Sequence, residues 1–361
     1  MSQEKIKEIL SNINEPVLNT DYVTLDFVKG ISLNGKNLTL TLGISEINDE
    51  IISQASDEIK KEFSKLMPDL NIKELKFVIG VTEHKDEKKN SVMPGIKNTI
   101  AVASGKGGVG KSTIAVNLAV ALAKEGAKVG LIDADIYGPS IPLMFGRNKK
   151  PGVTKVGEKS MLVPLERYGV KVMSIGFLIE EKSAVVWRGP MASSALKQFI
   201  GDVVWDDLDY LLFDMPPGTG DIQLTLSQTI PLTCAIIVTT PQDISLADAR
   251  KGYVMFERVN VPTMGIIENM SYYKNPDGSR EYIFGKGGGK KMSEEFNVKL
   301  LGEIPLNMKI REGGDSGSPV ADGGQDTELT EIFRKMAKDT IREINLMNIK
   351  SSADPGLVIE I

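Results

Sequence analysis

From Thr99 onward the chain carries a series of short apolar runs, each bounded by residues that favour turns. The runs are 99–104 (TIAVAS), 128–135 (KVGLIDAD), 170–175 (VKVMSI), 210–215 (YLLFDM), 234–240 (CAIIVTT), 264–270 (MGIIENM) and 300–305 (LLGEIP). Runs without polar alternation are typical of strands that are buried on both faces. Because helical stretches separate them, we expect an α/β domain in which helices cover both faces of a mainly parallel sheet.

The segment before residue 82 has a different periodicity and predicts a small α+β domain over residues 1–81. Its expected elements are a helix over Glu4–Ile13, a hairpin over Val28–Ile44, a helix over Ile47–Met67 and a closing strand over Leu75–Val81. The dipeptide Asn34-Gly35 lies between the two halves of the hairpin, and this pair favours the tight turns that connect antiparallel strands.

Between these two patterns the composition changes. Residues 84–90 read HKDEKKN and Pro94-Gly95 follows, so we expect residues 82–96 to be a solvated linker. The second domain is then expected over residues 97–346 and to close with a helix over Leu329–Leu346. The remaining residues, 347–361, are expected to form a C-terminal tail.

Composition narrows the class of protein. A chain of 361 residues with 41% hydrophobic and 25% charged residues is expected to form about two globular domains. Its net charge of -5 disfavours a broad nucleic-acid surface. The charged start MSQEKIKEIL is unlike a signal peptide, and no apolar run is long enough to span a bilayer. We therefore expect a cytoplasmic protein that binds neither nucleic acid nor membrane.

The strongest chemical signal follows the first apolar run of the second domain. The chain reads Gly105-Lys106-Gly107-Gly108-Val109-Gly110-Lys111-Ser112-Thr113 and then continues as a helix, which matches G-x-x-x-x-G-K-[ST] in its strand–loop–helix setting. The glycines let backbone N–H groups point at phosphate oxygens, and the helix N-terminus adds partial positive charge. Lys111 can reach the β- and γ-phosphates, and the Ser112 hydroxyl can bind Mg²⁺. The loop predicts ATP binding with magnesium and ATP hydrolysis.

Lys106 is a second lysine inside this loop, and a generic phosphate loop does not require it. Either it is a solvated surface residue, or it contacts a phosphate of a nucleotide held by a neighbouring subunit. The loop by itself leaves both interpretations open.

Phosphoryl transfer also needs a carboxylate near the metal and a group that positions the attacking water. Asp214 ends one apolar run and precedes the stiff turn 216–221 (PPGTGD), which is suited to sensing a γ-phosphate. Asp133 and Asp135 end another run, and strand alternation would place them on one face. One of these two could support the magnesium shell and the other could orient water, although aspartates at strand ends can also be helix caps. His84 is the single histidine and lies in the expected linker, so histidine catalysis is not expected.

These motifs carry a family resemblance. The segments GKGGVGKST, DADIYGPS and FDMPPGTGD resemble the deviant Walker-A ATPases related to MinD and ParA. Further segments are similar to the Mrp/ApbC family of iron–sulfur cluster carrier ATPases: WRGPM (187–191), ENMSYY (268–273), IFGKGGG (283–289) and LLGEIPL (300–306). Residues 12–28 (NINEPVLNTDYVTLDFV) resemble the N-terminal iron–sulfur assembly domain of that family.

The resemblance implies a P-loop NTPase that works as a homodimer and transfers iron–sulfur clusters to apoproteins, together with assembly factors, at the expense of ATP. Lys106 matches the lysine that contacts nucleotide across the dimer, Asp135 the water-positioning aspartate and Asn269 the adenine-recognising position. Asp214 matches the Walker-B aspartate. Taken with the motifs above, the candidate catalytic residues are Lys106, Lys111 and Asp135, and the candidate Mg²⁺ residues are Ser112, Asp133 and Asp214.

The sequence departs from the family pattern at the cluster ligands. Typical members carry Cys-Pro-x-Cys where residues 275–278 here read Asn-Pro-Asp-Gly, which favours a turn and offers no thiolate. Ser45 takes the place of a cysteine of the first domain, and the DPE-like motif of that domain is reduced to residues 14–16 (NEP). Cys234 is the single cysteine and lies in an apolar run, so we expect a buried core thiol.

Two other functions stay open at this point. A positioning ATPase of the MinD or ParA kind would need a membrane-binding helix or a basic DNA-binding face. The C-terminal helix carries Arg334, Lys335, Lys338 and Arg342, but acidic residues lie among them. The other alternative is an ATP-gated assembly factor or chaperone that does not itself hold a cluster.

Overall fold

The computed structural model describes residues 3–135, 138–146, 149–178, 189–323 and 327–353, which form two compact units. The first unit comprises the chain up to Lys85, the short segment Glu125–Ala127 and the C-terminal helix from Lys338 onward. The second unit comprises Asp86–Lys124 and Lys128–Ala337.

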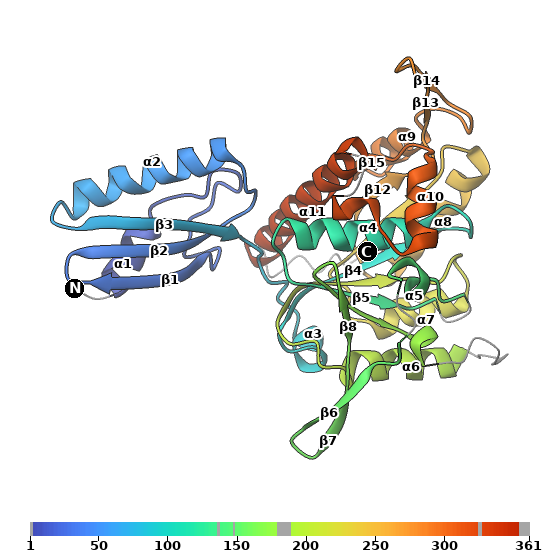
Figure 1. Ribbon diagram of the computed structural model, residues 1–361, viewed down its shortest axis with the longest axis horizontal. Helices are drawn as coiled ribbons and strands as arrows, with labels where there is room; N and C mark the ends of the chain where they lie inside the picture. Colours follow the sequence, from blue (N-terminus) through green and yellow to red (C-terminus); the bar gives the residue numbers. More distant parts are fainter. Residues whose placement is uncertain (1–2, 136–137, 147–148, 179–188, 324–326, 354–361) are drawn as a thin grey trace. The chain divides into compact units, whose positions relative to one another are not determined.

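The first unit contains the small α+β fold that the sequence predicts. Its elements are α1 (Gln3–Leu10), β1 (Val28–Asn34), β2 (Asn37–Ile44), α2 (Asp49–Leu66) and β3 (Asn71–Ile79). Strand β1 pairs with β2 antiparallel, and β2 pairs with β3 parallel (Figure 1). Gly35 adopts a positive φ of 63° beside the terminal pair Asn34 and Asn37, which confirms the predicted hairpin turn.

The last helix, α11 (Thr327–Ala353), is longer than predicted, because it continues beyond residue 346. Its C-terminal part completes the first unit: Leu346 and Ile349 pack against the core of that unit. The Asn345 carboxamide accepts from the backbone N–H of Thr82 at 2.8 Å and donates to the carbonyl of Gly80 at 2.9 Å. The remainder of the expected tail, residues 354–361, lies outside the described residues.

The second unit is an α/β fold built on a mainly parallel sheet, as predicted. Its strands are β4 (Ile96–Ala103), β5 (Val129–Asp133), β6 (Gly152–Val156), β7 (Lys159–Val163), β8 (Leu165–Arg167), β9 (Val170–Ser174), β10 (Leu208–Asp214), β11 (Cys234–Thr239), β12 (Thr263–Glu268), β13 (Tyr273–Lys274), β14 (Arg280–Glu281) and β15 (Lys299–Glu303). Within the described ranges the main sheet has eight strands in the order β15-β12-β11-β4-β10-β5-β9-β8. Its strands run parallel except for β8, which pairs antiparallel with β9.

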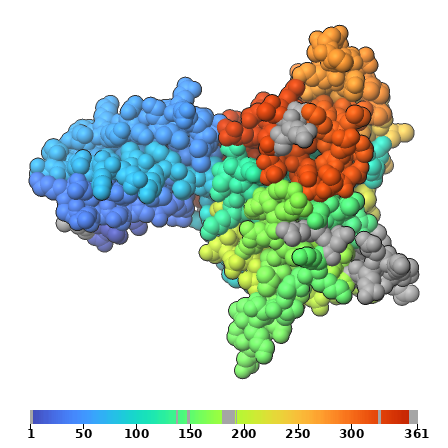
Figure 2. All heavy atoms as spheres, viewed as in Figure 1, coloured from blue at the N-terminus to red at the C-terminus, as the bar shows by residue number. Residues whose placement is uncertain are grey.

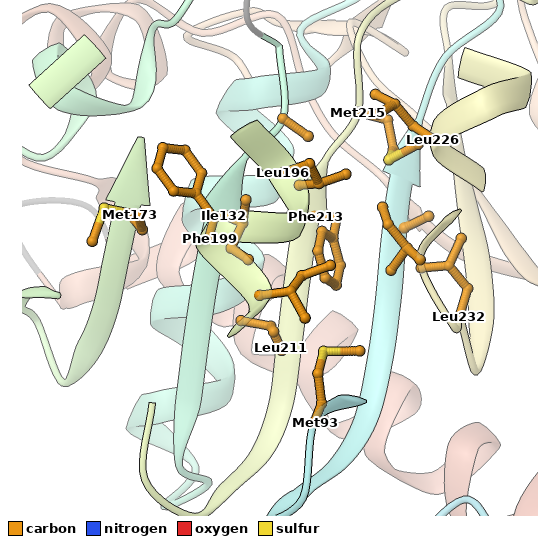
Figure 3. Close-up of a cluster of buried hydrophobic side chains, with 14 of the residues drawn as sticks. Met93, Ile132, Met173, Leu196, Phe199, Leu211, Phe213, Met215, Leu226 and Leu232 are labelled. Carbon is orange, nitrogen blue, oxygen red and sulfur yellow. The ribbon is translucent and has the colours of Figure 1, made fainter. Parts of the chain in front are cut away.

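Helices cover both faces of this sheet. The described helices of this unit are α3 (Glu87–Val92), α4 (Lys111–Lys124), α5 (Ile141–Met144), α6 (Gly189–Gly201), α7 (Asp221–Thr229), α8 (Asp243–Arg258), α9 (Gly288–Glu295), α10 (Met308–Ser316) and the first part of α11, with short 3₁₀ turns at Ile175–Phe177 and Val320–Asp322. Helix α4 packs on one face of the sheet, and α6 and α7 cover the other (Figure 1). Leu196 and Phe199 of α6 meet Leu211 and Phe213 of β10 in a large buried cluster (Figure 3).

The predicted linker over residues 82–96 is more ordered than its charge suggests. It contains helix α3, which Asp86 caps by accepting a hydrogen bond from the N–H of Lys89 at 2.6 Å, and β4 begins at Ile96. Lys89 is fully buried and donates from Nζ to the carbonyl of Lys97 at 2.8 Å. One of the charged residues that suggested a solvated connector is therefore an internal hydrogen-bond donor.

Strands β6 and β7 form a separate two-stranded ribbon that projects from the second unit (Figure 2). Every residue of β6 is exposed. This ribbon was not predicted, because its sequence has no core-facing period.

Candidate nucleotide-binding site

The phosphate loop lies between the end of β4 and the start of α4, and three hydrogen bonds fix its backbone. The Ser104 hydroxyl donates to the carbonyl of Lys106 at 2.9 Å. The Gly218 N–H, from the turn after β10, donates to the carbonyl of Ser104 at 3.0 Å. The Asn269 carboxamide, after β12, donates from Nδ2 to the carbonyl of Val109 at 2.8 Å. The loop is thus fixed by segments that follow two other strands.

Two glycines of the loop are required by their surroundings. A Cβ on Gly105 would lie 2.2 Å from the backbone carbonyl of Asp248, so only glycine lets the loop pass helix α8 at this distance. Gly110 has a φ of +83°, and a Cβ there would lie 2.2 Å from Nδ2 of Asn269. Gly107 and Gly108 are exposed and leave their backbone open to a ligand.

Lys111 and Asp214 form a buried ion pair at the centre of the site. Their Nζ and Oδ1 atoms are 2.5 Å apart, and the two side chains are 6% and 0% exposed. The same ammonium group lies 3.3 Å from the Ser112 hydroxyl oxygen. The structure therefore brings together the predicted phosphate-binding lysine, the predicted Walker-B aspartate and the predicted magnesium-binding serine.

Asp133 lies beside Asp214 because strands β5 and β10 pair in register at these two residues. Burial and the neighbouring Asp214 carboxylate raise the pKa of Asp133 well above its ordinary value. Both of its oxygens accept hydrogen bonds: Oδ2 from the Ser174 hydroxyl at 2.9 Å and the Ile141 N–H at 3.3 Å, and Oδ1 from the Asp135 N–H at 3.2 Å. This carboxyl group therefore connects the end of β9, the start of α5 and the segment after β5.

Asp135 does not share a strand face with Asp133, because β5 ends at Asp133 and Asp135 follows it. It is half-buried, and its backbone N–H donates a hydrogen bond to Asp133.

Two other predicted residues lie in the loop and at the start of α4. Lys106 is half-buried, and the Thr113 carbonyl accepts a hydrogen bond from Nδ2 of Asn117 at 2.8 Å. Of the motif segments, Ile136, Tyr137, Trp187 and Arg188 lie outside the described residues.

Two polar residues of the site were not predicted as functional. Ser174 ends β9, beside Asp133 in register, and donates to that carboxyl group. Glu268 ends β12 and is fully buried directly before Asn269. Their signal in the sequence is a polar residue at the carboxyl end of an apolar run, which is where ligands bind in parallel sheets.

The expected position of the cluster-binding cysteines is a small hairpin. Strands β13 and β14 flank residues 275–279, where the Asn275 N–H donates to the carbonyl of Ser279 and the Gly278 N–H to the carbonyl of Asn275, both at 2.9 Å. Gly278 has a φ of +86°. The hairpin is closed by its own backbone and carries no sulfur.

Cys234, the single cysteine, is buried in β11 as predicted, and burial raises the pKa of its thiol to about 12. Such a thiol is a poor metal ligand, because metals bind the thiolate. Among the described residues, no group of three or more His, Cys, Asp and Glu side chains is placed to hold a metal ion. The residues that the structure describes therefore do not form a cluster site by themselves.

In the first unit, Ser45 occupies the position of a cysteine in the family pattern. The Ser45 hydroxyl donates to Oε1 of Glu15 at 2.7 Å, the Ser45 N–H donates to the same oxygen at 2.9 Å, and both residues are buried. The two positions at which the sequence departs from the family pattern therefore lie together in space. They form a hydrogen-bonded oxygen pair without a thiol.

Comparison with known proteins decides the family. The family described as ParA, NUBPL iron-transfer P-loop NTPase, matches residues 95–341. The chain belongs to this family. The resemblance to iron–sulfur carrier ATPases is thereby confirmed, and the second unit is a P-loop NTPase. In the described part of the chain, no helix combines the length and the apolar character needed to cross a membrane.

Relatives of this NTPase extend the match to its first unit. The iron–sulfur cluster carrier protein of Escherichia coli strain K12 is 45% identical over 334 residues, which are 91% of this chain and 88% of the relative. That of Synechocystis is 40% identical over 353 residues, 96% of this chain and 99% of the relative. A nucleotide-binding protein from Archaeoglobus fulgidus, solved in complex with ADP, is 38% identical with a TM-score of 0.58, and the match covers 70% of this chain and 98% of that one.

Proposed function

We propose that this protein is a magnesium-dependent ATPase of iron–sulfur cluster assembly that works as a cytoplasmic homodimer and delivers clusters to apoproteins. The observation that carries the ATPase part is the buried Lys111–Asp214 pair under the phosphate loop. The carrier part is supported by the family and by relatives named iron–sulfur cluster carrier proteins.

The residues present fit a magnesium ion. Asp214 Oδ2 is buried and has no hydrogen-bond partner among the described residues, and the Ser112 hydroxyl lies next to Lys111. Asp214 and Ser112 would hold the ion, and Asp133, whose oxygens both accept hydrogen bonds, would support the shell indirectly. When bound, the ion would neutralise charge on the β- and γ-phosphates. Lys111 would leave Asp214 and bind the same phosphates.

Asp135 is the proposed water-positioning residue. It follows β5 at the carboxyl edge of the sheet, and its N–H is held by Asp133 at 3.2 Å, which restrains where the side chain can reach. Lys106 is proposed to contact the nucleotide of the partner protomer. The Lys106 carbonyl accepts a hydrogen bond from Ser104, which fixes the backbone at this position. The lysine side chain is long enough for its ammonium group to reach across a dimer interface.

Replacing Asp135 by asparagine is expected to lower kcat for ATP hydrolysis about 100-fold while ATP binding persists. Because ATP then stays bound, we expect the variant to accumulate as a dimer with Mg-ATP, measured by light scattering, and to return to monomer with ADP. Asp322→Asn is the matched control, because Asp322 forms only a surface ion pair with Lys124 at 2.7 Å. Unchanged hydrolysis in Asp135→Asn would remove Asp135 from the mechanism.

The cluster would be cargo whose thiolates come from outside this chain. This part of the proposal rests on the thiol-free hairpin at residues 275–279 and on the buried Cys234. It favours an assembly factor that hands over a cluster held partly by a second molecule.

Anaerobic reconstitution with ferrous iron and sulfide tests this. We expect the protein alone to hold no stoichiometric iron or sulfide, and Cys234→Ala to behave identically. With a thiol donor such as glutathione and an apoferredoxin as recipient, we expect cluster transfer to be faster with Mg-ATP than without it. A stoichiometric cluster on the protein alone that Cys234→Ala abolishes would refute external ligation, and transfer indifferent to both protein and ATP would refute the carrier function.

A further inference from the structure

The glycine-rich segment before helix α9 resembles a second phosphate loop in composition, since residues 285–291 read GKGGGKK. Its helix N-terminus is already occupied by a side chain of the protein. The Gly289 N–H, in the first turn of α9, donates to Oε2 of Glu268 at 2.5 Å. A carboxylate satisfies a free N–H there and interacts favourably with the helix dipole. The segment therefore binds an internal carboxylate where a phosphate loop would bind a ligand.

The glycines make this contact possible. A Cβ on Gly289 would lie 2.8 Å from Cβ of Glu268, and a Cβ on Gly288 would lie 2.6 Å from Cδ1 of Leu246. A side chain at Gly289 would push the start of α9 away from the end of β12, and one at Gly288 would push it away from α8. Gly289 is thus explained by Glu268, and Gly288 by packing against α8.

Glu268 is bound on every side that the structure describes. The Ser271 hydroxyl donates to Oε1, the Gly289 N–H donates to Oε2, and the Ile304 N–H donates to the Glu268 backbone carbonyl at 2.8 Å. The residue is fully buried. The carboxylate ties the end of β12 to α9, and the Glu268 backbone carbonyl ties it to the segment after β15.

The next residue is Asn269, which touches the phosphate loop. Its N–H donates to the carbonyl of Thr239 at 2.8 Å, and its Nδ2 donates to the carbonyl of Val109 at 2.8 Å. The bond from Nδ2 to the loop fixes the orientation of the amide group, and the amide oxygen is its acceptor for a hydrogen bond from a base. The 6-amino group of adenine can donate such a bond, whereas the 6-oxo group of guanine cannot.

We propose that Glu268 is a positioning residue for nucleotide selection: with its glycine-rich cap at residues 285–289, it holds Asn269 where the amide oxygen accepts from adenine. This inference rests on the proposed binding of ATP at the loop. It assigns the glycine-rich segment a role in base selectivity.

Glu268→Gln tests the inference, because it keeps the shape and removes the charge that caps α9. We expect about tenfold weaker ATP binding, with most of the kinetic effect in KM, and a smaller preference for ATP over GTP. Binding of tripolyphosphate, which has no base, should weaken less than ATP binding, because Asn269 affects it only through its contact with the phosphate loop. Glu303→Gln is the matched control, because Glu303 pairs with Glu268 in register but is exposed, and it should match the wild type in all three measurements.

A double-variant comparison separates positioning from a general structural role. If Glu268 acts through Asn269, the pair Glu268→Gln and Asn269→Ala should bind ATP as tightly as Asn269→Ala alone. Should Glu268→Gln not fold, Gly289→Ala displaces the same cap and should give the same selective loss. Equal loss of ATP and tripolyphosphate binding in either variant would overturn the inference. A wild-type protein that binds tripolyphosphate but does not prefer ATP would also overturn it, whereas binding of neither ligand would overturn the proposed function instead.

Discussion

Replacing Lys111 by methionine is expected to lower kcat for ATP hydrolysis by about three orders of magnitude, the largest effect we expect of any single substitution in this protein. The Lys111 ammonium is the buried cation of the site, 2.5 Å from the Asp214 carboxylate and 3.3 Å from the Ser112 hydroxyl, at the first residue of α4. Methionine keeps the unbranched side chain and removes only the charge that would bind the β- and γ-phosphates. Phosphate release at saturating Mg-ATP measures the effect.

Lys124→Met is the control for that variant, because Lys124 ends the same helix and forms a half-exposed ion pair with Asp322 at 2.7 Å. We expect it to hydrolyse ATP at the wild-type rate. Lys111→Met that retains more than about a tenth of the wild-type kcat would show that the phosphates are bound by other groups, since one preorganised donor is usually worth a factor of about 100 or more.

Asp214→Asn is expected to destabilise the nucleotide-free protein as well as to lower hydrolysis about 100-fold. The substitution leaves the Lys111 charge buried without its counter-charge, which typically costs about 3–5 kcal/mol of unfolding free energy. The neighbouring Asp133 stays buried in this variant, and burial is the main cause of its raised pKa, so we do not expect it to replace the counter-charge fully. The expected loss is therefore about 3 kcal/mol or more. Denaturant unfolding without nucleotide measures it.

The neutral pair provides the sharpest check on this explanation. The double variant Lys111→Met and Asp214→Asn removes both charges, so it should be more stable than Asp214→Asn alone. Asp209→Asn serves as the control on the same strand: Asp209 is paired with Lys97 at 2.7 Å at the opposite end of β10. It should lower stability but leave kcat unaffected. A double variant no more stable than Asp214→Asn would argue against an uncompensated charge as the cause.

The strand positions were largely predictable from the sequence, because apolar runs at the centre of a parallel sheet are buried on both faces. Strands β5 and β10, which end at Asp133 and Asp214, lie within two of the predicted runs and confirm this. The phosphate loop was also recognisable, because its motif is contiguous in the sequence. Strand order is not local. Ser174 follows a recognised run, yet only the pairing of β5 with β9 places it beside Asp133. Glu268 was noticed only within a family motif, because its partner Gly289 is distant in sequence.

Other misses have different physical causes. Residues 84–90 suggested a linker because charged residues are usually solvated, but Lys89 is buried against the carbonyl of Lys97. Helix α11 runs past residue 346 because its end packs in the first unit, and that contact depends on the tertiary fold. The proposed roles of Lys106 and Asp135 remain predictions, since each depends on a bound nucleotide.

The ion pair between Lys111 and Asp214 also has a consequence for the release of ADP. With the site empty, Lys111 has an internal partner, so a nucleotide must compete with Asp214 for it, and the observed affinity is weaker than the intrinsic one by the strength of that pair. Once hydrolysis has removed the γ-phosphate, ADP offers the lysine fewer charges, and Asp214 can take it back. The aspartate that is proposed to help bind ATP would then also help to expel ADP.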